Sequence, residues 1–168
     1  MKSEIPLPVP ILHQINTSQG GVPKYPVEKA RVSYDGVEGD RQQNRVYHGG
    51  RDRALCLFSW DLIQALRQEG HKLEAGSTGE NLTIVHVNWE RLGPGNRLRI
   101  GRDVHIEIIS YADPCRRNAQ WFVNADYKRI SHKVHPGWSR LYARVVSEGV
   151  IRRGDLINIS METAARVS

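Results

Sequence analysis

The stretch GVEGDRQQNRVYHGGRDRALCLFS, from Gly36 to Ser59, joins two polar, glycine-rich loops to an apolar segment. The loops are residues 36–41 and 48–53, and the apolar residues 54–58 are typical of a buried strand. Glycine allows tight turns that expose backbone N–H groups, and arginine carries a planar, permanent positive charge. The two loops are therefore suited to binding an anion. Ordinary turns and surface ion pairs use the same residues, so that alternative stays open.

Length and composition indicate a soluble globular protein of one domain. The chain has 168 residues, of which 39% are hydrophobic and 25% charged. No apolar run approaches the roughly 18 residues of a membrane span, and the first ten residues lack the apolar region of a signal peptide. We therefore expect a cytoplasmic protein without a membrane partner. Two cysteines far apart in sequence do not predict a disulfide framework.

The charge balance favours anionic partners. Lysine and arginine total 24 against 18 aspartate and glutamate residues, a formal net charge of +6. Basic residues are spread along the chain without a run of five, and no zinc-finger or RNP-like pattern is present. The phosphate of a small molecule is therefore the favoured partner, and a nucleic-acid-binding module is kept as a less favoured alternative.

Apolar periodicity and glycine turns predict a mainly β fold. One helix is expected at 60–69, with Ser59 as its N-cap and Gly70 at its end, and a short helix at 118–124. Residues 149–155 read as a turn. Strands are expected at 11–15, 29–32, 54–58, 82–84, 98–100, 104–109, 141–146 and 156–159. This pattern indicates a sandwich or barrel in a single domain, residues 1–168, with its core at about 12–159 and a frayed tail at 160–168.

The two cysteines have different surroundings. Cys56 lies between Leu55 and Leu57, which is typical of a small buried hydrophobic residue. Cys115 follows a proline and precedes Arg116 and Arg117, and neighbouring cations favour the thiolate, the form that acts as nucleophile and metal ligand. An unreactive cysteine in a turn would have the same sequence context, so both interpretations stay open for Cys115.

The order of several short motifs resembles the MOSC domain family (molybdenum cofactor sulfurase C-terminal domain), most closely its small stand-alone bacterial members. The similarity runs from about Leu12 to Asp155. The motifs are Gly36–Arg41, His48-Gly49-Gly50, Asp52-Arg53-Ala54 and Gly79-Glu80-Asn81-Leu82, with an opening Gly20-Gly21-Val22-Pro23-Lys24.

The resemblance implies an antiparallel β-barrel with glycine-rich loops and a few short helices. It also implies a molybdenum-pterin cofactor (Mo-molybdopterin), with Cys115 as the metal or persulfide residue. His48 and Glu80 would relay protons. The residues expected to bind the cofactor are Gly39, Asp40, Arg41, His48, Gly49, Gly50, Asp52, Arg53, Gly79, Glu80, Asn81, Arg116 and Arg144.

Stand-alone relatives of this kind reduce N-hydroxylated bases and related compounds. The resemblance therefore implies a molybdenum-dependent oxidoreductase that cleaves an N–O bond and takes electrons from a partner protein. One alternative is a non-catalytic carrier, in which Cys115 holds a persulfide or the cofactor and works with a sulfur-donating or cofactor-donating protein. The basic nucleic-acid-binding module is the other alternative.

Overall fold

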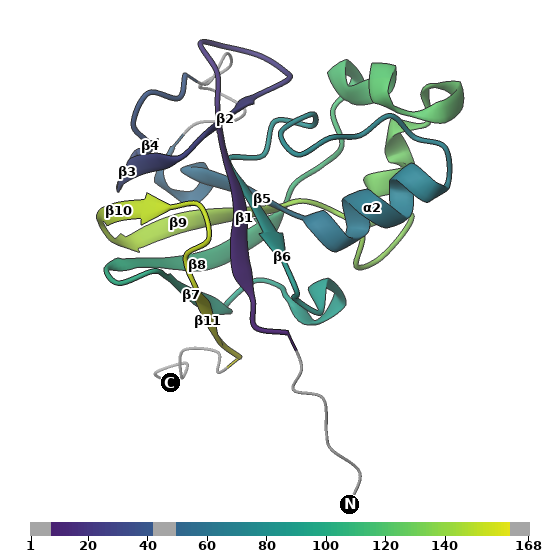
Figure 1. Ribbon diagram of the computed structural model, residues 1–168. Helices are drawn as coiled ribbons and strands as arrows, with labels where there is room; N and C mark the ends of the chain where they lie inside the picture. Colours follow the sequence, from purple (N-terminus) through teal and green to yellow (C-terminus); the bar gives the residue numbers. More distant parts are fainter. Residues whose placement is uncertain (1–7, 42–49, 162–168) are drawn as a thin grey trace, which may run out of the picture.

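The computed structural model describes residues 8–41 and 50–161 (Figure 1). The strands form an eight-stranded sheet in the order β11-β7-β8-β9-β5-β6-β1-β2 and a three-stranded sheet in the order β10-β3-β4. Their bounds are β1 Ile11–Thr17, β2 Tyr25–Val27, β3 Lys29–Ser33, β4 Gly36–Val37, β5 Leu55–Ser59, β6 Leu82–Val85, β7 Arg97–Ile100, β8 Val104–Tyr111, β9 Leu141–Ser147, β10 Gly149–Arg152 and β11 Ile157–Ser160.

The large sheet is not closed into a barrel, so the expected closed barrel is wrong although the mainly β class is right. Strand β2 occupies one edge of β1 from Ile15 to Thr17, and β6 occupies the other edge. Only the start of β1 remains to meet the far end of the sheet. There, Ile11 makes an isolated bridge with Leu156, just before β11. All strand pairs are antiparallel except β5 with β6.

The α-helix expected at 60–69 is confirmed near those bounds, since α2 spans Trp60–Gln68. The Ser59 hydroxyl accepts a hydrogen bond from the Leu62 backbone N–H at 3.1 Å, which satisfies one of the unpaired donors at the helix start. Gly70 follows with a φ of 101°, a conformation that glycine adopts at low cost. The helix buries Ile63 and Leu66 on one side of the sheet.

The described residues also form five short 3-10 turns. They are η1 Arg51–Arg53, η2 Trp89–Arg91, η3 Arg116–Trp121, η4 Val123–Ala125 and η5 Tyr127–Ile130. The short helix expected at 118–124 is thus a pair of 3-10 turns instead. Figure 1 shows η3–η5 beside α2, away from the small sheet. Phe122 and Ile130 from these turns pack with Phe58 and Leu66.

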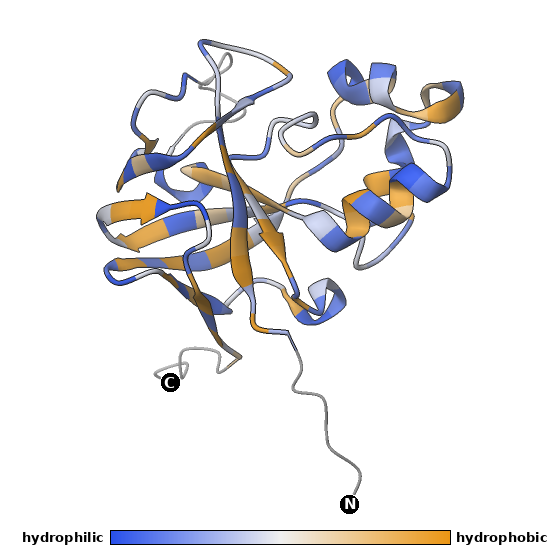
Figure 2. Cartoon of the chain, viewed as in Figure 1, coloured by the Kyte–Doolittle hydropathy of each residue, from blue (hydrophilic) through white to orange (hydrophobic). Residues whose placement is uncertain are grey.

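The strands bury a continuous apolar core. Leu12, Leu57, Ile84, Ile106 and Ala143 are all fully buried, and Figure 2 shows hydrophobic residues concentrated along these central strands. Burial of such side chains is the main favourable contribution to folding.

Three strands were not expected from the sequence. Residues 149–152 form β10, which pairs with β3, so the turn expected at 149–155 is wrong over its first half. Strands β2 and β4 are too short to show periodicity. Of the tail expected to fray, Ser160 ends β11 and residues 162–168 lie outside the described part. No helix in the described residues is long and apolar enough to cross a membrane.

Gly36 gives a direct test of this packing. A Cβ at Gly36 would lie 2.6 Å from the Ala54 carbonyl oxygen, whereas a Cβ at Gly154 would meet nothing within 4 Å; φ is +125° and +90° respectively. Gly154→Ala should lower the free energy of unfolding by about 1–2 kcal/mol through backbone strain alone. Gly36→Ala should lower the free energy of unfolding by a clearly larger amount, because the backbone at Ala54 must also move to make room for the new Cβ. Urea unfolding of both variants measures the difference, and equal losses would contradict the packing described.

Candidate functional site

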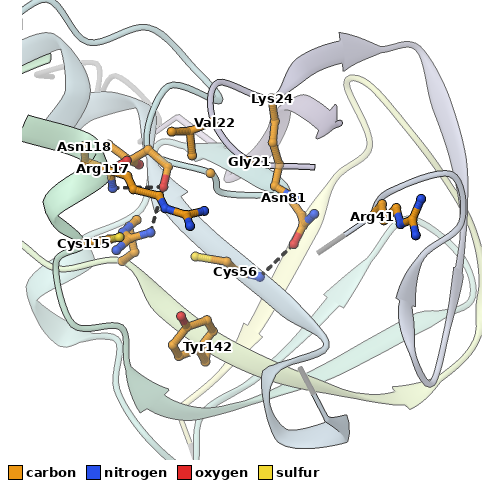
Figure 3. Close-up of a pocket in the computed structure, with 13 residues that line it drawn as sticks. Gly21, Val22, Lys24, Arg41, Cys56, Asn81, Cys115, Arg117, Asn118 and Tyr142 are labelled. Atoms are coloured by element: carbon orange, nitrogen blue, oxygen red, sulfur yellow. Dashed lines mark hydrogen bonds between the residues drawn. The ribbon is translucent and has the colours of Figure 1, made fainter. Parts of the chain in front are cut away.

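A cavity opens where the loop after β1, strand β5, the loop before β6, turn η3 and strand β9 meet (Figure 3). Segments from every third of the chain contribute to its wall. The residues that line it are Gly21, Val22, Lys24, Arg41, Cys56, Thr78, Gly79, Asn81, Cys115, Arg117, Asn118, Arg140 and Tyr142.

A buried carboxylate holds three loops together at one side of the cavity. Asp40 forms an ion pair with Lys24, with 2.5 Å between Oδ2 and Nζ, and these side chains are 4% and 8% exposed. The Asp40 carboxylate also accepts hydrogen bonds from the Asn81 side-chain amide at 2.8 Å and from the Ser18 backbone N–H at 2.9 Å. Charged groups are retained at such depth only when paired and hydrogen-bonded, and here they are.

Asn81 extends this network to the central sheet. Its side-chain oxygen accepts a hydrogen bond from the Cys56 backbone N–H at 3.1 Å, and its own backbone N–H donates to the Cys56 carbonyl at 2.8 Å. The side chain therefore bonds to another strand and to Asp40, rather than to its own turn. Asn81 fixes the glycine-rich loop against β5 and places Gly79 at the cavity.

Glu80 lies inside this loop and does not line the cavity. Its fully buried carboxylate accepts hydrogen bonds from the Gly76 backbone N–H at 2.6 Å, from the Thr78 hydroxyl at 2.8 Å and from the Thr83 hydroxyl at 3.2 Å. Burial raises the pKa of the Glu80 carboxyl, against the lowering effect of these donors. Through these hydrogen bonds, Glu80 stabilises the conformation of the loop.

Cys115 and Arg140 lie on the opposite wall. Cys115 is half-buried, and it precedes η3 as its N-cap residue. Arg140, only 5% exposed, donates to the Thr78 carbonyl and to the Asp113 carbonyl, both at 2.8 Å. The Asn118 side chain donates to the same Thr78 carbonyl at 3.2 Å. A fixed positive charge is thereby held in the wall that carries Cys115.

Cys56 is buried, as expected, but it also lines the cavity. Strand β5 places its thiol opposite Tyr142 of β9. Burial raises the pKa of the Cys56 thiol, and the nearby Arg140 guanidinium acts in the other direction. Cys56 is therefore part of the site wall rather than a purely internal core residue.

The described wall is strongly basic. Lys24, Arg41, Arg117 and Arg140 line the cavity, and no aspartate or glutamate is among the described residues that do so. Asp40 compensates the positive charge of Lys24 from behind the wall. Such a wall favours an anionic ligand.

The structure brings four of the expected site residues together at this cavity: Arg41, Gly79, Asn81 and Cys115. His48 and Gly49 lie outside the described residues. Two of the expected arginines have other partners. Arg53 lies over the Tyr142 ring at 5.2 Å from its centroid, and Arg144 forms an ion pair with Glu107 at 3.0 Å. The remaining expected residues that do not line the cavity are Gly39, Asp40, Gly50, Asp52, Glu80 and Arg116.

Sequence reasoning did not select the other nine lining residues as site residues, among them Lys24, Thr78, Arg117, Asn118, Arg140 and Tyr142. Alternation along a strand gives one usable signal, because side chains two residues apart face the same side. That rule groups Arg140 and Tyr142 with Arg144, the arginine chosen from the sequence. The alternation rule does not indicate which end of strand β9 borders the cavity.

Asp40→Asn should be strongly destabilising. The substitution leaves the buried Lys24 ammonium without its countercharge, and removing one partner of a buried ion pair costs about 3–5 kcal/mol. Glu38→Gln is the matched control, because its pair with Arg31 has side chains 58% and 50% exposed and should change stability by less than about 1 kcal/mol. Chemical unfolding measures both. Similar small losses would show that Asp40 does not hold the loops.

Glu80 should make stability depend on pH. A carboxyl whose pKa is higher in the folded than in the unfolded chain stabilises the fold fully below its unfolded pKa, and this contribution is lost as pH rises through the folded value. Lowering the pH from about 7 toward 5 should therefore shift the difference in unfolding free energy between wild type and Glu80→Gln in favour of the wild type. A difference that is flat, or that shifts toward the variant, would contradict the burial of an ionisable Glu80.

Comparison with known proteins gives a consistent family assignment. The sequence matches the family described as "MOSC domain" over residues 44–158. It is 29% identical over 137 residues to "Uncharacterized protein YflK" of Bacillus subtilis (strain 168), covering 80% of this chain and 60% of YflK. It is also 29% identical over 132 residues to a protein named "Reductase" from Gibberella moniliformis, covering 76% of this chain but 23% of that protein. The aligned part of the chain thus spans less than two thirds of the length of each of these relatives, 60% of one and 23% of the other.

Solved structures share the fold. YiiM from Geobacillus stearothermophilus superposes with a TM-score of 0.72 at 21% identity, covering 90% of this chain and 75% of that one. YiiM from Escherichia coli gives a TM-score of 0.65 at 20% identity, covering 96% and 72%. At this level of identity the likeness concerns the fold alone. With the family match extending over more than half of its residues, the chain belongs to the MOSC domain family.

Proposed function

We propose that this protein is a molybdenum-cofactor-dependent reductase of N-hydroxylated compounds. The observation that carries the proposal is the position of Cys115, a half-buried thiol in a cavity whose described charged groups are all cationic. Membership of the MOSC family supports the cofactor, and the fungal relative named "Reductase" supports redox chemistry.

The residues present fit such a cofactor. A thiolate is a soft ligand suited to molybdenum in a sulfur-rich environment. Among the described residues no group of three or more His, Cys, Asp or Glu could hold a metal ion, so a metal bound here would bring most of its ligands with it. That condition is met by a metal already held in an organic cofactor.

Two buried polar atoms in the wall also favour a ligand site. The Asn118 side-chain oxygen and the Arg140 Nε have no hydrogen-bond partner among the described residues. Buried polar groups are almost always paired, so unpaired ones beside a cavity indicate that its contents complete the local bonding, directly or after a small adjustment of the wall.

In this arrangement Cys115 would bind the metal, and Arg41, Arg117 and Arg140 would attract the phosphate of the pterin. Arginine suits phosphate because its planar group can donate two parallel hydrogen bonds. When bound, the cofactor supplies the two-electron chemistry, while the protein supplies orientation and electrostatics. The backbone of the Gly76–Asn81 loop, shaped by Glu80 and Asn81, lies close enough to border the ligand at Gly79.

The overall reaction converts R–NH–OH to R–NH₂ and water, with the uptake of two electrons and two protons. The electrons would come from a reduced partner protein. Glu80, one of the two residues expected to relay protons, is enclosed in its loop and does not line the cavity. The other, His48, lies outside the described residues. The basic wall would also attract an anionic or polarised substrate.

Molybdenum content tests the proposal. Protein produced in cells that make the cofactor should contain nearly one molybdenum per chain, and Cys115→Ala should lose most of it because the metal loses its protein ligand. Cys56→Ala is the matched control, since it removes a thiol from the same cavity. We expect that control to keep its metal. Elemental analysis of the three proteins measures this directly.

Other outcomes would favour the carrier. A wild-type protein without molybdenum, even after incubation with free cofactor, would contradict the reductase. If it then held cyanolysable sulfur that is lost in Cys115→Ala, Cys115 would be a persulfide carrier. Equal loss of metal in the Cys115 and Cys56 variants would show that the cavity, rather than Cys115 itself, determines binding.

A further inference from the structure

Asn118 is held beside Cys115 by the first turn of η3. Its backbone N–H donates to the Cys115 carbonyl at 2.9 Å, and Cys115 is the N-cap residue of the turn. Both residues line the cavity, and Figure 3 shows them at the same end of it. A ligand atom bound near the Cys115 thiol is therefore also near the Asn118 side chain.

Hydrogen bonding fixes which end of the Asn118 amide is the oxygen. The amide nitrogen donates to the Thr78 carbonyl at 3.2 Å, and the same carbonyl accepts a hydrogen bond from Arg140 at 2.8 Å. Exchanging the amide nitrogen and oxygen would bring two acceptors together with no hydrogen between them. The other end of the amide is therefore an oxygen, which can only accept.

This oxygen is an acceptor without a donor. The Asn118 side chain is 1% exposed, yet its Oδ1 has no hydrogen-bond partner among the described residues. Buried polar atoms are almost always paired. The charged groups of the described wall are all cations, which can donate, but in their observed positions none of them donates to Oδ1. A ligand that carries a hydrogen of its own would satisfy this atom.

We infer that the Asn118 side-chain oxygen accepts a hydrogen bond from the hydroxyl group of the substrate, so that Asn118 selects N-hydroxylated compounds over N-oxides. The inference rests on the proposed function. An N-oxide has a similar N–O bond, but its oxygen carries no hydrogen and would meet the acceptor with lone pairs alone. The cationic wall by itself would favour the N-oxide, because that oxygen bears the greater negative charge.

Both kinds of compound need the same redox chemistry. When the N–O bond of R₂N–OH breaks, two electrons from the reduced partner protein and two protons from solvent give R₂N–H and water. An N-oxide, R₃N–O, takes up the same electrons and protons to give R₃N and water. Asn118 neither gives nor takes a proton in either reaction. A difference between the two rates therefore reports how the site recognises the oxygen.

The experiment uses the molybdenum-loaded protein, with reduced methyl viologen as electron donor and two compounds in competition. They are N-hydroxy-N-methylaniline and N,N-dimethylaniline N-oxide, which has a second methyl group in place of the hydroxyl hydrogen. The wild type should consume the hydroxylated compound faster. Asn118→Leu, which replaces the amide with an apolar group of similar size, should reduce this preference by about 10–100-fold, the usual effect of one hydrogen bond to a buried group.

Competition in one solution also protects the test against poor folding of the variant. Both compounds meet the same active molecules, so the ratio of their consumption does not depend on how many are folded and loaded. Gln120→Leu is the matched control, since it removes an exposed amide from the same turn. Gln120 donates to the Arg117 carbonyl at 3.1 Å and does not line the cavity. This variant should keep the wild-type preference and molybdenum content.

Binding without reductant gives a readout that does not depend on turnover. Neither compound is converted under these conditions. The wild type should bind N-hydroxy-N-methylaniline more tightly than the N-oxide, and Asn118→Leu should lose this difference. A purely structural role for Asn118 would weaken the binding of both compounds by the same factor and leave their ratio unchanged, which would contradict the inference.

Other results separate this inference from the proposed function. A wild type that reduces the N-oxide as fast as the hydroxylated compound, or an Asn118→Leu variant with the wild-type preference, would exclude the hydrogen bond but leave the reductase intact. Loss of molybdenum from an Asn118→Leu variant that is as stable as the wild type would instead assign Asn118 to cofactor retention. A wild-type protein that holds molybdenum but reduces no N-hydroxylated compound would overturn the proposed function and this inference with it.

Discussion

The site depends on the buried contact between the Asp40 carboxylate, the Lys24 ammonium and the Asn81 amide. These residues come from three loops, which backbone hydrogen bonds also join, from the Lys24 N–H to the Gly76 carbonyl at 2.9 Å and from the Arg41 N–H to the Ser18 carbonyl at 2.8 Å. A carboxylate enclosed in protein requires several donors, and no single loop supplies enough of them. Satisfying Asp40 therefore draws the loops into one arrangement. Asn81 joins that arrangement to Cys56 of β5, and so to the hydrophobic core.

The same contact explains why a basic cavity is tolerated. Lys24 is neutralised locally by Asp40, and Arg140 is held by two backbone carbonyls. Arg140 is thereby fixed in the wall, where no carboxylate of the described residues pairs with it, and its positive charge faces the cavity. A carboxylate inside the cavity would have cancelled the field that an anionic ligand needs. The Lys24–Asp40 pair therefore stabilises the site, whereas Arg140 supplies the positive charge that faces the ligand.

Local patterns predicted most elements of the fold but not how distant segments meet. Ser59, Gly70 and the apolar periodicity of residues 60–69 are sufficient to define α2, since helix capping and termination act over a few residues. Closure of the barrel depends on which edge of β1 the short strand β2 occupies. Strand β2 has only three residues, too few for a sequence pattern to indicate where it pairs. Strand β10 was missed because its pairing with β3 joins residues more than a hundred positions apart.

The site was predictable where chemistry is local. Cys115 was singled out by its flanking proline and arginines together with the family resemblance, and it lies at the cavity. Arg144 was selected because it is a charged residue in an apolar strand, but its charge is matched by Glu107 on the neighbouring strand. Arg140, four positions earlier, has no such partner across the sheet and lines the cavity. Arg140 and Arg144 differ in which residue of the neighbouring strand lies opposite each of them. The sequence of one strand does not show how it is aligned with its neighbour.

The most direct test of a cofactor site at Cys115 is a crystal structure of the metal-loaded protein, with anomalous diffraction recorded on both sides of the molybdenum absorption edge. The account predicts a molybdenum peak within bonding distance of the Cys115 Sγ, with further density extending toward the arginines of the wall. A molybdenum peak elsewhere in the molecule, with the Cys115 thiol unbound, would contradict it.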